Sequence, residues 1–381
     1  MDSRICEMLG IEFPLLAFSH CRDVVVEVSK AGGFGVFGAA TITPKQLEIE
    51  LSWIDAHIDG RPYGVDLILP NAYEGKGEQK SPEQFLAMLP REHIEFTNSI
   101  LEAHGVPTDD VDDAARRDAM GFADNLGIDG AQGHLDVAFS HPIKLIANAL
   151  GVPPKPMLEM GKRNGVAVAA LVGAKSHAIN QVQAGVDVLV VAGGEAGGHC
   201  GSVSTMVLVP EIHEAIQEFG DTPILAAGGI VTGRQMAACM AMGASGAWTG
   251  SVWLTTAEGE TNPVVKEKML AASSSDTVRS RSRTGKYTRQ LRSPWTDAWQ
   301  RPDAPDPLPL PLQRMIAHPA LMKVDKLSQA GHKGARELAT YYVGQGVGLM
   351  NASQSARGVV YDFKQDFINA YERLAKAVGA E

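Results

Sequence analysis

The chain has 381 residues, of which 45% are hydrophobic and 20% charged, and its formal net charge is −10. This composition is typical of a soluble globular protein, and the excess of acidic residues argues against a general nucleic-acid binder. No stretch approaches the roughly 18 uninterrupted apolar residues of a membrane helix, and residues 1–4 lack the pattern of a signal peptide, so we expect a cytoplasmic protein with no membrane contact.

Eight short apolar runs follow one another along the chain, and each is a candidate β-strand: Phe13–Phe18, Gly33–Gly38, Tyr63–Leu69, Leu135–Ser140, Val166–Val172, Val186–Ala192, Ile224–Ala227 and Ala247–Trp253. The segments between them have helical patterns: Asp23–Ala31, Pro44–His57, His141–Leu150, Pro156–Asn164, Ser176–Ala184, Pro210–Phe219 and Gln235–Met242. Eight alternating units predict a parallel α/β fold, a TIM (β/α)8 barrel. The alternative is a doubly wound open sheet, whose glycine fingerprint should follow the first strand rather than the sixth to eighth.

Two segments fall outside this repeat. Residues 74–133 are polar and acidic, and they predict an inserted excursion, either a lid or a small helical insertion. Residues 262–381 follow the last unit, with a proline-rich connector at 302–311 and predicted helices at 312–318, 327–340 and 365–378. We therefore expect a barrel made of residues 1–73 and 134–261, with a helical insertion at 74–133 and a C-terminal helical extension at 262–381.

The sixth predicted strand runs into a glycine-rich turn. Residues 193–201 contain five glycines, and His199 lies among them. Glycines at this density are unfavourable in a helix interior, but they suit a turn with positive φ and close backbone contact to a ligand. His199 therefore lies where an imidazole can face a bound phosphate or a flat ring.

The next strand repeats the arrangement. Ile224–Ala227 is followed by Gly228 and Gly229, and the eighth strand runs into Gly250 and Ser251. In a parallel barrel these turns end on one face, where backbone N–H groups after the last two strands commonly hold phosphate. His20, at the end of the first strand, belongs to the same barrel mouth and is a candidate substrate-binding residue beside His199. His141 is expected at this functional end of strand four and His134 at the opposite end.

Residues 279–292 contain six basic side chains in fourteen positions. They predict either a solvated linker or a grip on the phosphates of coenzyme A or a pyridine nucleotide. The four cysteines, Cys6, Cys21, Cys200 and Cys239, lack paired metal-ligand spacing and are expected to be free thiols. No metal is expected.

The glycine-rich motifs resemble those of the FMN-dependent nitronate monooxygenases, formerly called 2-nitropropane dioxygenases. The resemblance rests on residues 194–201, 226–230 and 242–251 in this order and spacing. It extends to residues 9–14, 31–35, 63–67, 284–289 and 344–346, and so covers nearly the whole chain apart from the excursion.

The resemblance implies a TIM barrel that holds FMN noncovalently, with His199 as catalytic base. It places flavin contacts at Asp66, Gly197, Gly229, Trp248, Thr249 and Ser251, with Gly228 and Gly250 close to the phosphate. Asp66 stands where many relatives have asparagine, and an ionised carboxylate there would accept hydrogen bonds but not donate them.

The implied activity is oxidation of alkyl nitronates by O2 to carbonyl compounds and nitrite. The alternative from the same broad family is an NAD(P)H-dependent flavin reductase acting on an enoyl or enone thioester of coenzyme A or an acyl carrier protein. A catalytically silent flavin-binding protein is a third hypothesis. The expected partner is accordingly a small molecule, either a nitronate or an acyl thioester, and a homodimer is compatible with all three hypotheses.

Overall fold

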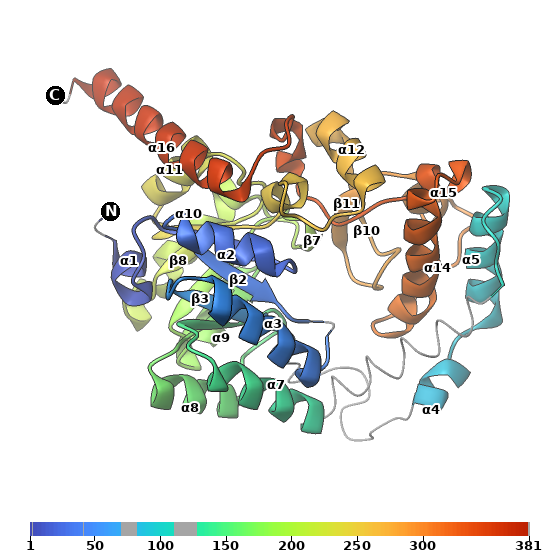
Figure 1. Ribbon diagram of the computed structural model, residues 1–381, viewed down its shortest axis with the longest axis horizontal. Coiled ribbons are helices and arrows are strands. Elements are labelled where there is room, and N and C mark those ends of the chain that lie inside the picture. The colour runs from blue at the N-terminus through green and yellow to red at the C-terminus, as the bar shows by residue number, and fades with distance from the viewer. Residues whose placement is uncertain (2, 41, 70–81, 110–127, 380–381) are drawn as a thin grey trace.

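The computed structural model describes residues 1, 3–40, 42–69, 82–109 and 128–379. Eight parallel strands close into a barrel in the order β1-β2-β3-β4-β5-β6-β8-β9, which confirms the predicted TIM barrel (Figure 1). The strands are β1 (Leu15–Ser19), β2 (Phe34–Gly38), β3 (Tyr63–Leu67), β4 (Leu145–Asn148), β5 (Ala167–Val172), β6 (Val188–Ala192), β8 (Ile224–Ala227) and β9 (Gly246–Thr249).

The prediction for strand four was wrong. Residues 135–140 belong to helix α7 (Ile128–Ser140), and the strand lies in the segment 141–150 that was predicted to be helical. Leu135 and Ala138 are buried three positions apart, as on one helix face. Short apolar runs fit a buried strand or a buried helix equally well, so periodicity did not separate them.

This correction reverses two histidine placements. The His134 ring bonds the carbonyl of Ile42, in the segment that follows β2, and so lies toward the carboxyl ends of the strands. His141 lies at the opposite end, where its Nδ1 is 2.6 Å from Asp55 Oδ2. Asp55 also accepts a hydrogen bond from the hydroxyl of Tyr63, the first residue of β3.

Helices surround the barrel in alternation with its strands. They are α2 (Arg22–Lys30), α3 (Pro44–His57), α7, α8 (Lys155–Asn164), α9 (Lys175–Gln183), α10 (Thr205–Ile216) and α11 (Gly233–Ala241). The short helix α1 (Arg4–Leu9) contributes Ile5 and Leu9 to the same apolar cluster as Phe34 and Leu225 of the strands. None of the helices in the described part of the chain is long and apolar enough to cross a membrane.

The described part of the insertion contains α4 (Pro82–Ala87), α5 (Arg91–Ala103) and the first turns of α7. Residues 70–81 and 110–127, on which the rest of the predicted excursion falls, lie outside the described residues. Helix α5 packs against the C-terminal helix α14 (Leu312–Gln329) at one side of the molecule (Figure 1).

Beyond residue 262 the chain is not purely helical. Strands β10 (Thr277–Ser280) and β11 (Thr288–Leu291) form an antiparallel hairpin, and β11 also pairs with the two-residue strand β7 (Gly198–His199). The remaining helices are α12 (Pro263–Ala271), α13 (Pro294–Ala298), α15 (Lys333–Leu338) and α16 (Ala356–Val378). The basic run is therefore an ordered hairpin, and its interpretation as a linker was wrong.

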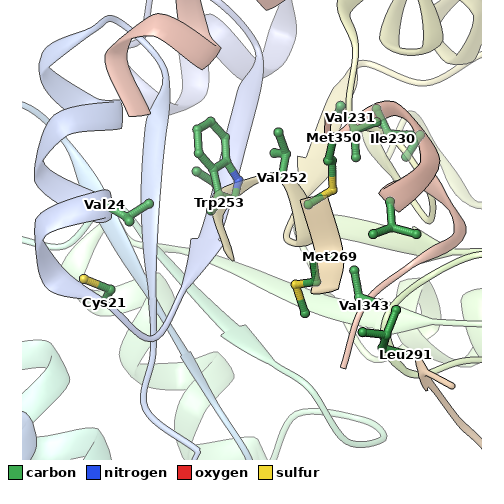
Figure 2. Packing of buried hydrophobic residues seen from close by; sticks show 14 of the residues in the cluster. Cys21, Val24, Ile230, Val231, Val252, Trp253, Met269, Leu291, Val343 and Met350 are labelled. Carbon is green, nitrogen blue, oxygen red and sulfur yellow. The ribbon is translucent and has the colours of Figure 1, made fainter. Parts of the chain in front are cut away.

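The C-terminal segment shares its apolar core with the barrel. Met269, Leu291 and Met350 belong to one buried cluster with Trp253 and Val252, which follow β9 (Figure 2). Because these side chains are removed from water together, the hairpin and the barrel mouth are held in one arrangement. The histidine turn is thus fixed from two sides, by β6 and by β11.

Candidate active site

A cavity of about 1430 Å³ opens at the carboxyl ends of the barrel strands. The turns after the strands line its floor, and the β10–β11 hairpin and helix α14 contribute further walls. All the predicted site residues line this one cavity: His20, Asp66, Gly197, His199, Gly228, Gly229, Trp248, Thr249, Gly250 and Ser251. The location is the one at which TIM-barrel enzymes carry their active sites.

The two glycine turns are neighbours on this face. Gly193 donates its backbone N–H to the carbonyl of Ala227 at 3.1 Å, and Thr205 Oγ1 lies 3.2 Å from the carbonyl oxygen of Gly228. Gly228 and Gly229 have φ values of 110° and 67°, a region that other residues rarely adopt. A Cβ at Gly228 would lie 2.6 Å from Thr205 Oγ1, so the turn requires glycine for both conformation and space.

Glu195 holds the glycine-rich loop in place. Its carboxylate accepts a hydrogen bond from the backbone N–H of Thr205 at 2.9 Å and another from the Thr205 hydroxyl at 3.1 Å. From the other side, Arg289 Nε donates to the carbonyl of Gly194 at 2.9 Å. The carboxylate is thus occupied at the N-terminus of α10, where negative charge is favourable, and it positions the loop.

His199 is placed by strand pairing between distant segments. In β7 it lies opposite Thr288 of β11, and its Nε2 forms a hydrogen bond of 2.9 Å with Thr284 Oγ1 in the hairpin turn. The residue is open to the cavity but surrounded by the cavity walls. Burial by these walls, with a smaller contribution from the positive charge of Lys286, lowers the pKa of His199 to about 4. The imidazole is therefore neutral near pH 7, and its proton-accepting form is present.

His20 has an equally defined orientation. Its Nδ1 donates to the carbonyl of Gly38 at 2.7 Å, and its ring meets the edge of Phe18 at a centroid distance of 5.1 Å. Burial lowers the pKa of His20, although the bond to Gly38 opposes the shift. In the neutral ring Nε2 is then an acceptor, because Nδ1 carries the proton.

Asp66 is buried in the cavity wall. The residue is 5% exposed, and Oδ1 has no hydrogen-bond partner among the described residues. Burial raises the pKa of this carboxyl well above its ordinary value. The raised pKa favours the protonated form of the carboxyl, which can donate a hydrogen bond as well as accept one.

The other predicted contacts have partners inside the protein. The Thr249 hydroxyl donates to the carbonyl of Leu16 at 2.9 Å and accepts from Trp253 Nε1 at 3.0 Å. Ser251 Oγ accepts from the N–H of Gly344 at 2.9 Å, and a Cβ at Gly197 would lie 2.8 Å from the same nitrogen. These residues shape the cavity wall, where they can offer a ligand their backbone groups and, at Ser251, a hydroxyl proton.

Trp248 completes the floor of the cavity. Its ring is stacked with Phe18 at a centroid distance of 6.2 Å and an interplanar angle of 23°, and it is 6% exposed. The pair is packed beside Gly250, whose Cβ position lies 3.9 Å from Phe18 Cδ1 and is otherwise open.

Several cavity residues were missed by sequence reasoning. Thr284 lies in the motif 284–289 that carried part of the family resemblance, so a signal existed but its contact with His199 did not follow from it. Tyr341, Tyr342 and the face of α14 also line the cavity, and no motif marked them. Cys21, Asp23 and Glu260 bring three potential metal-ligand atoms within 4.8 Å of one another, but the Cys21 thiol donates to the carbonyl of Glu258 at 3.0 Å.

A parallel barrel with glycine turns and a histidine in one cavity at the carboxyl ends of its strands is typical of the class of cofactor-dependent barrel enzymes. The family model described as nitronate monooxygenase matches residues 3–366. The chain therefore belongs to the nitronate monooxygenase family, and it is an enzyme, a flavin-dependent oxidoreductase.

Individual relatives agree with this assignment. The chain is 52% identical over 377 residues to "Putative monooxygenase Rv1533" of Mycobacterium tuberculosis, with 98% of each chain covered. It is 25% identical over 332 residues to "Probable nitronate monooxygenase" of Staphylococcus haemolyticus, covering 83% of this chain and 85% of the other.

Solved structures share the fold. Nitroalkane oxidase from Streptomyces ansochromogenes has a TM-score of 0.78 at 22% identity, with 97% and 99% of the two chains covered. FabK from Thermotoga maritima has a TM-score of 0.69 at 24% identity, with 99% of each chain covered.

Proposed function

We propose that this protein binds FMN in the cavity and oxidises alkyl nitronates with O2 to carbonyl compounds and nitrite. Two observations support FMN. The cradle at Gly228, Gly229 and Gly250 offers backbone N–H groups and no side chains, which suits a phosphate. Asp66 Oδ1 is a buried polar atom without a partner among the described residues, and a polar edge of the flavin would satisfy it.

Bound FMN would supply the redox chemistry, taking electrons from the substrate and passing them to O2. The chain's own residues bind and orient the substrate and move protons. His199, neutral near pH 7, would remove the α-proton of a neutral nitroalkane or hold an existing nitronate by a hydrogen bond. His20 would present its Nε2 to the substrate from the β1 side of the cavity mouth.

The single observation that carries the proposal is that three features of the candidate site line the same cavity. The neutral imidazole of His199, the Asp66 carboxyl, whose Oδ1 has no partner in the described part of the chain, and the glycine cradle all line one cavity. The purified protein should be yellow and should release FMN on denaturation. A colourless protein that does not take up added FMN would rule the proposal out.

A second candidate function is supported by the size of the cavity. Small-molecule sites commonly occupy about 300–1,000 Å³, and this cavity is larger, with basic residues of the hairpin along one wall. This arrangement favours a large second ligand, as in NAD(P)H-dependent reduction of an enoyl or enone thioester. His199 would then protonate or polarise the substrate opposite the carbon that receives hydride.

Anaerobic mixing separates the two functions. Rapid bleaching of the flavin by NADH or NADPH would support the reductase, whereas bleaching only by a nitronate or nitroalkane would support the monooxygenase. For the domain arrangement, we propose that residues 1–73 and 134–261 hold the cofactor and that the segment 262–381 completes the substrate side.

A further inference from the structure

The six basic residues of the hairpin region differ in their partners. Arg281 is paired with Asp306 at 2.9 Å and Arg292 with Asp297 at 2.8 Å. Neither arginine lines the cavity. Their charges are thus compensated away from the site.

Arg279, Arg283 and Lys286 do line the cavity. Within the described ranges, no carboxylate oxygen lies within 4.0 Å of their charged nitrogens. The sixth residue, Arg289, donates to the carbonyl of Gly194 and to the Thr277 hydroxyl. The three cationic groups on the cavity side therefore lack ion-pair partners among the described residues, whereas Arg281 and Arg292 outside the cavity have them.

The immediate surroundings do not neutralise these cations. The Arg279 guanidinium lies 4.7 Å from the ring centroid of Tyr287, and its buried Nε has no hydrogen-bond partner among the described residues. Arg283 donates to Gln290 Oε1 at 2.7 Å and lies 4.8 Å from the ring centroid of Tyr342. Aromatic faces and amides stabilise a cation but do not cancel its charge.

Asp325 of α14 lies close enough to Arg283 for their charges to interact. Burial raises the pKa of this carboxyl, although Arg283 opposes the shift. The shortage of partners is local, because the chain has 44 acidic and 34 basic residues. Like charges in a partly desolvated wall are costly unless an anion joins them.

We propose that Arg279, Arg283 and Lys286 form a second anion site, which binds the phosphate or diphosphate ester of a second ligand. The inference rests on the proposed function in one respect: the FMN phosphate occupies the glycine cradle and leaves these cations free. Three cations on one wall suit a multiply charged phosphate better than a single carboxylate, and guanidinium groups match its oxygens.

The cavity has room for such a ligand. Its wall on α14 extends from Arg314 to Gln329, a span of roughly 22 Å at about 1.5 Å per residue. A phosphate held at the hairpin would allow an extended molecule to reach His199, whose Nε2 is bonded to Thr284 of the same hairpin. Two sources fit this chemistry, a pyridine nucleotide that reduces the flavin and a thioester substrate with a phosphorylated carrier arm.

The test is calorimetric titration of the purified, FMN-loaded protein with inorganic pyrophosphate. Lys286→Met and Arg279→Gln should each weaken binding by about 10- to 100-fold, the range for hydrogen bonds to charged groups. Arg292→Gln is the matched control, because it removes one positive charge from the same region but outside the cavity. Its affinity should stay within about twofold of the wild type, as for an exposed ion pair.

The source is then identified by competition. NADPH, NADH and a coenzyme A thioester are each tested for displacement of bound pyrophosphate. The compound whose affinity falls in Lys286→Met belongs to the class of ligand that the site binds. Equal weakening by Arg292→Gln, or no weakening in either cavity variant, would overturn the site. Loss of FMN from Lys286→Met would also overturn it, because the cations would then hold the cofactor phosphate. If the protein binds no FMN but pyrophosphate binding follows the variants, the proposed function fails and the anion site stands.

Discussion

Thr284 Oγ1 lies 2.9 Å from His199 Nε2, although the two residues are 85 positions apart. The contact exists because β11 pairs with β7, so that the hairpin turn reaches the glycine-rich loop. Thr284 is buried, at 5% exposure, and it also accepts the N–H of Lys286 at 3.3 Å. It is therefore a positioning residue that orients the imidazole and fixes which ring nitrogen faces the substrate.

We expect Thr284→Val to lower kcat by about 2- to 10-fold, the equivalent of one buried neutral hydrogen bond. Thr284→Ser keeps the hydroxyl and should restore the rate. The variants are compared by steady-state kinetics at matched FMN content. Equal kcat in Thr284→Val and the wild type would show that the contact does not orient the base.

His199→Asn should retain FMN and lose turnover with neutral nitroalkanes by about 10²- to 10⁴-fold, the usual contribution of a general base. The neighbouring Cys200→Ser is the control, and its rate should be unchanged. A fully active His199→Asn would mean that another group takes the proton. An inactive Cys200→Ser would instead point to the thiol.

The pH profile follows from the lowered pKa of His199. Burial, assisted by the charge of Lys286, sets the pKa at about 4. Protonated imidazole cannot accept a proton, so kcat/KM should be level near neutrality and fall as the pH drops through about 4. Lys286→Met removes the positive charge that helps to lower the pKa of His199, so the fall in kcat/KM should move to higher pH. Arg292→Gln should leave the pH of this fall unchanged. If the wild type and both variants lose kcat/KM at the same pH, Lys286 does not affect the pKa of His199.

Asp66→Asn should change the dissociation constant of FMN by less than about tenfold, which is one logarithmic unit. The raised pKa of Asp66 favours the protonated carboxyl, and a protonated acid resembles an amide in charge, size and hydrogen bonding. Asp66→Ala removes these contacts and should weaken binding. The measurement is fluorescence titration of the apoprotein with FMN. A much larger change in Asp66→Asn would show that the carboxyl is ionised.

Gly228→Ala should destabilise the protein more than an equivalent change elsewhere. The left-handed conformation costs a non-glycine residue about 1–2 kcal/mol, and the new Cβ would lie 2.6 Å from Thr205 Oγ1, which adds about 1–3 kcal/mol of overpacking. Gly165→Ala is the control, because Gly165 has φ 65° and no atom near its Cβ position. Equal free energies of unfolding in urea would remove the steric argument.

The barrel and the position of its site could be predicted because their signals are local. A buried parallel strand is a continuous apolar run, and a turn with positive φ requires glycine, so β6 and Gly193–Gly201 were recognisable in isolation. Strand four was not, because Leu135–Ser140 is apolar for a different reason: it is one buried face of a helix. In an apolar run of only six residues, neither the hydrophobic periodicity nor the length of the run distinguishes a strand from a helix.

The sequence by itself determined the fold class, the family and a set of candidate site residues that line the cavity, because backbone conformation and apolar burial leave recognisable short motifs. Only the tertiary structure decided the contact of Thr284 with His199, the raised pKa of Asp66, and which cations of 279–292 face the cavity. These properties depend on which groups, distant in the sequence, lie around a side chain. Its protonation state responds to burial and to the distances of neighbouring charges. A short sequence motif contains neither the burial nor these distances.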